Sequence, residues 1–371
     1  MRKALTLIVA SVLVFALVAS ISAAKGPDTA KVLIGFKGRP DPAVVAAVGG
    51  QVDYVYSIVP AVYAVVPAKA VEALKNNPLV DYVEYDGTCH IMAETTPWGI
   101  TDVGAPTVWS GGNKGDNVKI CIIDTGVDID HPDLAYLGGY DYYNNDSNPD
   151  DDHGHGTHCA GIAAALDNDI GVIGVAPLAH LYACKVLSAS GSGSWSTVAK
   201  GIDWARNNGM HVISMSLGGT LGSITLKNAC DNAWNAGIVL SVAAGNNGNS
   251  SGTGDNVTYP ARYDSCIAVA AYDSNHVRAY WSSTGPAVEL AAPGVSIYST
   301  YKGGTYTTMS GTSMACPHVT GVAALVKYAH WSYTNQQIRN AMDYTAIDLG
   351  AAGRDTWYGY GRVWAPGAVA Y

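Results

Sequence analysis

The sequence predicts an α/β protein with a mostly parallel central sheet covered by helices on both faces, preceded by a small α+β domain. After residue 118, short and nearly continuous apolar runs recur, as expected for strands buried on both faces. Helical patterns lie between these runs, which is typical of a parallel sheet. Residues 31–86 show a more compact alternation, and 371 residues, 48% of them hydrophobic, suffice for more than one domain.

The first 24 residues predict a signal peptide. Arg2 and Lys3 form a basic start, Ala4–Ala19 is an apolar run, and Ser22-Ala23-Ala24 offers the small residues of a cleavage site. An uncleaved membrane anchor is the alternative, because the segment could nearly span a bilayer. We expect cleavage, a secreted (extracellular) protein and no stable membrane association afterwards.

The small domain should occupy residues 25–92. Its expected strands and helices alternate in the order βαββαβ, the ferredoxin-like pattern. The strands are expected at 32–36, 52–59, 62–66 and 80–85, and the helices at 41–49 and 68–77. An independent binding module of this fold is an alternative to a role tied to the larger domain.

The larger domain should hold the central sheet. Its strands are expected at 118–123, 181–187, 212–217, 238–243 and 266–271, and its main helices at 197–207, 226–236 and 314–329. Ligands of such sheets gather beyond the carboxyl ends of the strands. Asp124 stands at one of these ends.

Charge and cysteine content exclude some functions. The formal net charge of −9 argues against a nucleic-acid partner, because no basic stripe is available for phosphates. None of the seven cysteines forms a C-x-x-C pair of the zinc or redox kind. We interpret them as buried small hydrophobic residues rather than a disulfide framework.

Three motifs predict acyl-transfer chemistry. Asp124-Thr125-Gly126 closes a strand, His155-Gly156-Thr157-His158 opens a small-residue helix, and Ser313 stands in Gly311-Thr312-Ser313-Met314-Ala315. A serine becomes a good nucleophile only when an imidazole takes its proton and a carboxylate orients that imidazole. The order Asp, His, Ser is known from subtilisin. The chain resembles the subtilisin-like serine proteases over almost its whole length, which implies the subtilisin-like fold and a serine endopeptidase.

The resemblance assigns a role to each residue. His155 would be the base, Asp124 its orienting carboxylate, and Ser313 the nucleophile at a helix N-terminus. Asn246 would donate to the oxyanion together with the Ser313 backbone N–H. A metal cluster of His153, His158 and Cys159, a Cys316 nucleophile, and sedolisin-type chemistry with a glutamate base are weaker alternatives.

The resemblance also implies a substrate groove for peptides or proteins. Ser216, Leu217 and Gly218 would pair with extended substrate through main-chain hydrogen bonds. Ala243, Ala244 and Gly245 would wall the specificity pocket, and Thr258 would narrow its floor. No carboxylate falls at these positions, so we expect a preference for apolar or medium-sized side chains.

Two loops resemble calcium sites, with oxygen ligands at the density that Ca²⁺ requires. The first, similar to a subtilisin site, would use Glu94, Asp133 and Asn168 with the carbonyls of Leu166, Ile170 and Val172. The second resembles a thermitase loop and contains Asp141, Asn144, Asp146, Asn148 and Asp150. A solvated acidic loop is the alternative for the second. Calcium would be structural and would take no part in bond cleavage.

The resemblance finally implies a self-processing zymogen. Residues 25–92 would be the inhibitory and chaperone pro-domain, residues 93–371 the catalytic domain, and Met92–Ala93 the bond that is cut. We expect a monomer. The alternative function is an exported calcium-dependent binding protein on an inactive protease scaffold.

Overall fold

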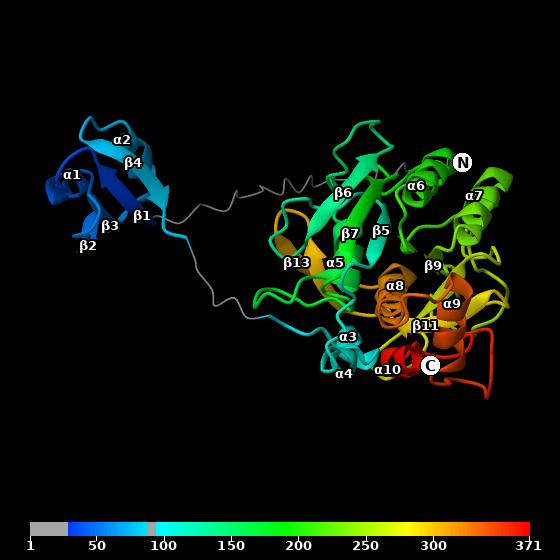
Figure 1. Ribbon diagram of the computed structural model, residues 1–371. Coiled ribbons are helices and arrows are strands. Elements are labelled where there is room, and N and C mark those ends of the chain that lie inside the picture. Colours follow the sequence, from blue (N-terminus) through cyan, green and yellow to red (C-terminus); the bar gives the residue numbers. More distant parts are fainter. Residues whose placement is uncertain (1–28, 88–93) are drawn as a thin grey trace, which may run out of the picture. The chain divides into compact units, whose positions relative to one another are not determined.

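The computed structural model describes residues 29–87 and 94–371 (Figure 1). The chain divides into two compact units, Met1–Ile91 and Met92–Tyr371. The signal peptide and the Met92–Ala93 junction lie outside the described residues. Among the residues that are described, no helix combines the length and apolar character needed to cross a membrane.

The small unit is a four-stranded antiparallel sheet with helices on one face. Its strands β1 to β4 stand in the order β2-β3-β1-β4, and Val32, Ile34, Val45, Val62 and Leu74 are fully buried in its core. The element order is βαββαβ, as the sequence predicts. The elements are β1 (Thr29–Phe36), α1 (Pro42–Ala47), β2 (Gln51–Val55), β3 (Ala61–Pro67), the 3₁₀ turn η1 (Ala68–Ala70), α2 (Val71–Lys75) and β4 (Val80–Tyr85). Strand β2 ends earlier than expected.

The large unit is built on a seven-stranded sheet in the order β11-β10-β9-β8-β5-β7-β6. Every neighbouring pair in it is parallel, which confirms the predicted architecture. The strands are β5 (Lys119–Asp124), β6 (Tyr136–Asp141), β7 (His180–Lys185), β8 (Val212–Met215), β9 (Val239–Ala243), β10 (Ile267–Tyr272) and β11 (Val288–Pro293). Strand β5 lies inside the sheet between β8 and β7, and its five residues after Lys119 are buried.

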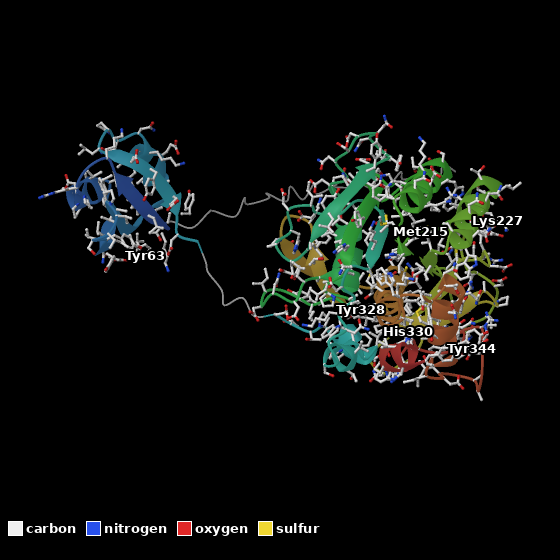
Figure 2. The ribbon with its side chains drawn as sticks, viewed as in Figure 1. Tyr63, Met215, Lys227, Tyr328, His330 and Tyr344 are labelled. Carbon is white, nitrogen blue, oxygen red and sulfur yellow. The ribbon has the colours of Figure 1, made fainter. Side chains whose placement is uncertain are left out.

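Helices cover both faces of this sheet. The helices α5 (His155–Ala164) and α8 (Thr312–Ala329) pack on one face, and α6 (Trp195–Asn207) and α7 (Ile224–Asn235) pack on the other (Figure 1). The remaining elements are α3 (Trp98–Asp102), α4 (Ala105–Trp109), the hairpin β12 (Ile297–Tyr301) and β13 (Thr305–Met309), α9 (Asn335–Tyr344) and α10 (Ala365–Ala370). Figure 2 contrasts Met215, buried at the end of β8, with Lys227 on the outer side of α7.

Candidate active site

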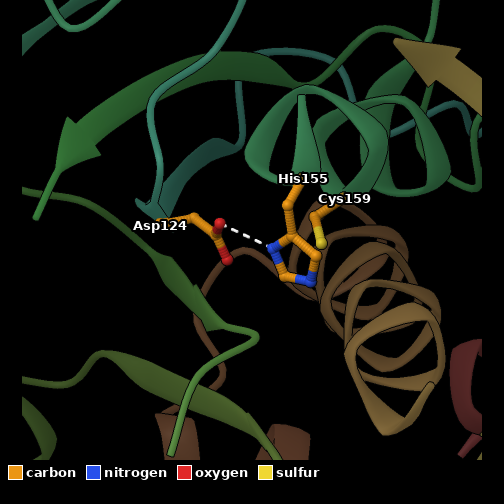
Figure 3. Close-up of side chains that lie close together, drawn as sticks. All are labelled: Asp124, His155 and Cys159. Atoms are coloured by element: carbon orange, nitrogen blue, oxygen red, sulfur yellow. Dashed lines mark hydrogen bonds and ion pairs between the residues drawn. The ribbon is translucent and has the colours of Figure 1, made fainter. Parts of the chain in front are cut away.

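The carboxyl end of β5 and the start of α5 bring a carboxylate and an imidazole together. Asp124 is the last residue of β5 and fully buried, and His155 is the first residue of α5. His155 Nδ1 lies 2.7 Å from Asp124 Oδ1, which also accepts the Thr125 N–H at 2.7 Å (Figure 3). This contact fixes the ring, so that its Nε2 is the atom left for proton transfer.

Glycines permit this close approach. Gly126 has φ 109°, which L side chains rarely adopt, and a Cβ there would meet the carbonyl of Pro149. A Cβ on Gly156 would collide with the carbonyl of Gly126. The two glycines of the Asp and His motifs are therefore required where α5 begins against the loop after β5.

The electrostatics of the pair suit a general base. Burial lowers the pKa of His155, but the negative charge of Asp124, its hydrogen bond and the charge of Asp151 outweigh burial, so the pKa is raised above its usual value. The carboxylate therefore stabilises the imidazolium that forms when the ring takes a proton.

A second buried carboxylate, Asp151, ties the backbone around the pair together. Its oxygens accept from the N–H groups of His153, Gly154 and Thr157 at 2.8–3.0 Å. They also accept from the Thr125 hydroxyl at 2.8 Å, and that hydroxyl accepts the Gly156 N–H at 2.9 Å. Burial alone would raise the pKa of Asp151, but the hydrogen bonds from Gly154, Thr157 and His153 outweigh it, so the pKa is lowered. No motif in the sequence pointed to Asp151.

Ser313 lies at the N-terminus of α8. Among the described residues its hydroxyl donates to the Ser216 carbonyl at 3.2 Å rather than to His155. Catalytic hydrogen bonds are often formed only in the complex with substrate. Rotation about one side-chain bond would redirect the hydroxyl.

Pro317 explains how the backbone at Ser313 is held. This proline lies in the second turn of α8, inside the helix. Having no N–H, it leaves the carbonyl four residues earlier, that of Ser313, without its helical donor. That carbonyl instead accepts from Ser216 Oγ at 2.7 Å and from Cys159 Sγ at 3.4 Å.

Asn246 is oriented so that its amide N–H groups remain available. Its Oδ1 accepts from the Thr312 N–H and the Thr312 hydroxyl, both at 3.0 Å. The Nδ2 group lies near Gly311, at 3.6 Å from where a Cβ on that glycine would stand. A side-chain donor thus lies beside the first turn of α8, as an oxyanion hole requires.

The other sulfur and imidazole groups here are poor candidates for chemistry. Asp124, His155 and Cys159 are the single group of three with metal-ligand spacing among residues 29–87 and 94–371, and Figure 3 shows the ring between the carboxylate and the sulfur. Burial raises the pKa of the Cys159 thiol well above its usual value and also raises that of Cys316, so both stay protonated. His158 is buried, its pKa lowered to about 4, with Nε2 near the carbonyls of Ile297 and Thr307.

A groove runs from Ser313 along the segment after β8. A cavity of about 220 Å³ is lined by six of the seven expected groove residues, Ser216, Leu217, Gly218, Ala243, Gly245 and Thr258, and by four more residues, Asn246, Asn247, Thr312 and Ser313. The Thr258 side chain packs against two glycines of this lining, because a Cβ on Gly218 or Gly245 would touch it. Ala244 corrects one expectation: it is fully buried in the core behind this cavity, and its carbonyl accepts from Thr258 Oγ1 at 3.2 Å.

A second cavity of about 460 Å³ continues the groove. Its walls are residues 216–219 on one side and Leu187 with residues 191–195 on the other, and Val198 completes its lining. Trp195 and Val198 were not expected from the sequence, since both belong to the apolar pattern of α6.

Sequence comparisons with known proteins agree with this geometry. A model described as "Subtilase family" matches residues 115–361. The chain belongs to the subtilase family. It is 45% identical over 368 residues to subtilisin E of Bacillus subtilis, covering 97% of this chain and 95% of that protein. It is 42% identical over 388 residues to the M-protease of Shouchella clausii, covering 100% of both, and 47% identical over 317 residues to a thermostable alkaline protease of Halalkalibacterium halodurans, covering 85% of each.

This subtilase is therefore a serine endopeptidase acting on peptide substrates, as the motifs predict. The scaffold alternative, an inactive binding protein, is not favoured by relatives named as proteases. The catalytic roles of individual residues remain predictions that the geometry accommodates.

The first expected calcium loop of the subtilase contains a buried ligand atom without a partner. Asp133 is fully buried; its Oδ2 accepts from the Val172 N–H at 2.9 Å, while Oδ1 has no partner among the described residues. Burial raises the pKa of Asp133 to about 6, and the nearby Glu94 charge adds to this. Glu94 Oε1 in turn accepts from the Asn168 N–H at 2.9 Å. A buried carboxylate with an unpaired oxygen and a second carboxylate nearby fit a bound cation.

The second loop is different. Both oxygens of Asp141 already accept hydrogen bonds from Asn144, and Oδ1 accepts a third from Tyr143, all at 2.8 Å. Asp146 accepts from the Asn148 N–H at 2.8 Å, and Asp150 from the Ile129 N–H at 3.4 Å. The other four expected ligands, Asn144, Asp146, Asn148 and Asp150, are exposed, and nothing in this arrangement marks a cation position. Calcium at this loop stays a prediction.

Proposed function

We propose that this subtilase is a secreted endopeptidase in which Ser313 attacks the peptide carbonyl, His155 takes its proton and Asp124 holds the ring. The observation that carries the proposal is the 2.7 Å contact between His155 Nδ1 and Asp124 Oδ1, and Ser313 is the second residue of α8, which packs against α5 on the same face of the sheet. Family membership supports the same assignment.

In the first half of the reaction, the Ser313 hydroxyl turns from the Ser216 carbonyl toward His155 Nε2. Its proton moves to that nitrogen as Oγ bonds the carbonyl carbon, and the imidazolium is stabilised by Asp124. The imidazolium then gives the proton to the leaving amine, which leaves an acyl-enzyme. Water, activated by the same ring, hydrolyses this ester.

The oxyanion of each tetrahedral intermediate would be held by Asn246 Nδ2 and the Ser313 backbone N–H. The bond from Thr312 to Asn246 Oδ1 supports this, because it fixes which end of the amide faces the reacting carbonyl. The positive end of α8 adds to the stabilisation.

Residues 216–218 would pair with an extended peptide, and the 220 Å³ cavity would take the side chain before the cut bond. This pocket is bounded by small residues and Thr258, which favours medium-sized apolar side chains.

The chain would be made as a zymogen with residues 1–24 as signal peptide and 25–92 as an inhibitory pro-domain, cut by its own active site at Met92–Ala93. Calcium would be bound by Glu94, Asp133 and Asn168, with carbonyls of residues 166–172. Bound there, it supplies positive charge to buried carboxylates and stabilises the loop without entering the chemistry.

A fluorophosphonate probe tests the nucleophile. We expect a single adduct on Ser313 in the purified enzyme, none in Ser313→Ala, and accumulation of unprocessed precursor in that variant. Ser310→Ala is the matched control, because Ser310 is exposed and its hydroxyl only accepts from the Ser296 N–H. A folded wild type that remains unlabelled would refute the proposal, and a clean mature N-terminus in Ser313→Ala would refute self-cleavage.

A further inference from the structure

A buried lysine, Lys185, lies under the catalytic edge of the sheet and takes no part in the reaction proposed above. It is the last residue of β7, directly opposite Asp124 in the parallel register with β5. Its side chain is only 1% exposed. A buried ammonium is costly unless each of its three N–H groups finds an acceptor.

The Lys185 ammonium has three acceptors, one on each of three loops. It donates to the Thr125 carbonyl at 2.7 Å, to the Leu187 carbonyl at 2.8 Å and to Asp152 Oδ1 at 2.7 Å. The donor capacity of the ammonium is fully used.

These three loops carry the functional parts of the site. Thr125 follows Asp124, Asp152 lies three residues before His155, and Leu187 lines the 460 Å³ part of the groove. The Asp124 carbonyl also connects the end of β5 to the groove rim, because it accepts the N–H groups of Val186 and Leu187 at 2.8 and 3.2 Å. Thr125 is therefore held on one side by Lys185 and on the other, through its hydroxyl, by Asp151 at 2.8 Å.

We propose that Lys185 is a positioning residue that couples the rim of the substrate groove to the Asp124–His155 pair. A peptide bound against Leu187 would contact the segment whose carbonyl accepts from the Lys185 ammonium. The same ammonium also donates to the loop after Asp124 and to the loop before His155. Lys185 would therefore fix the position of the groove rim relative to the Asp124–His155 pair. This inference rests on the proposed function, because it needs Asp124 and His155 to be the reacting pair.

A purely structural ion pair is the competing interpretation. It predicts fewer folded molecules but normal activity in each one. The ion pair with Asp152 is open to water on one side only, because the Asp152 side chain is 49% exposed while that of Lys185 is 1% exposed. The two carbonyl contacts, in contrast, are buried and lie next to the reacting groups. Displacement of a catalytic group by about 1 Å can cost about 10²-fold in rate.

The test is Lys185→Met, which keeps the length of the side chain and removes its donors. Fluorophosphonate titration counts active sites, so kcat/KM is expressed per titrated site for a short ester and for a longer peptide that reaches the rim. We expect kcat/KM for the peptide to fall at least tenfold, and the ratio of peptide to ester activity to fall at least threefold. Lys227→Met is the matched control, since Lys227 is an exposed lysine that pairs with Asp231 on α7.

Values within twofold of wild type for both substrates, or an equal loss for both, would overturn the coupling. If Lys185→Met gives no titratable enzyme, the same per-site measurement on the Asp152→Ala variant tests the coupling. A fall of threefold or more in per-site peptide kcat/KM supports the proposal, and unchanged activity overturns it. A wild type that the probe does not label would instead refute the proposed function, so the two failures are distinguishable.

Discussion

Replacing Asp124 by asparagine tests the electrostatic role of the buried carboxylate. The change keeps the size of the side chain and removes its charge next to His155 Nδ1, 2.7 Å away. At a charge separation of about 4 Å and an effective dielectric constant near 20, a carboxylate stabilises an imidazolium by about 4 kcal/mol. That is a factor of about 10³ in rate. The same substitution in another triad enzyme costs about 10⁴, so we expect kcat/KM to fall by about 10³–10⁴.

The pH profile gives a second, independent readout. A base acts only when neutral, so activity is lost as the pH falls through the pKa of His155. In the wild type that pKa is raised because Asp124 and Asp151 outweigh the lowering effect of burial. Without the Asp124 charge, the lowering effect of burial on the pKa of His155 is opposed less strongly. That pKa should fall, so the acid limb of kcat/KM should move to lower pH.

The assay is kcat/KM for a chromogenic peptide between about pH 4 and pH 9, on enzyme whose active sites have been titrated. Asp130→Asn, an exposed carboxylate on the following loop, should leave both the rate and the limb unchanged. A loss smaller than tenfold, or an acid limb that stays or moves to higher pH, would refute the reasoning.

Three further predictions follow from the site. Asn246→Ala should lower kcat by about 10²–10³ with little change in KM, the loss typical of one oxyanion donor; steady-state kinetics would measure it, and a loss confined to KM would contradict it. Chelation of calcium should lower the melting temperature of the wild type but not of Asp133→Asn, whose cation site has lost its buried charge; equal calcium dependence in both proteins would count against the first site. Thr258→Gly should enlarge the specificity pocket, so that kcat/KM for substrates with a large aromatic side chain rises relative to alanine; an unchanged ratio in a peptide series would show that Thr258 does not limit the pocket.

The sequence predicted the parts of the fold that have a strong local pattern. Strand β5 was recognisable because residues 120–123 form a continuous apolar run. Strand β6, with Gly138 and Gly139, and strand β11, with Glu289, were missed because neither is a continuous apolar run. Their place is set by pairing with β7 and β10, and such distant contacts leave little trace in the local sequence.

The candidate site likewise contains residues that the sequence predicted and residues that it did not. The motifs around Asp124 and His155 pointed to a contact that the structure contains. Lys185 and Asp151 gave no signal, because a lysine at a strand end and an aspartate in an acidic loop usually face solvent. Their burial depends on three loops closing over them. Ala244 was expected in the wall of the pocket together with its two neighbours, but it is buried in the core and does not line the cavity.

Because the thiols are buried, their reactivity can report the transient unfolding that would open this protease to self-digestion. All six cysteines within the described ranges are buried, and none is more than 2% exposed. A maleimide added to inhibited enzyme can therefore react only when the interior opens, and the rate of alkylation measures transient unfolding. Cys121 and Cys184 sit mid-sheet, whereas Cys230 lies on α7, so mass-resolved alkylation would tell which layer loosens first.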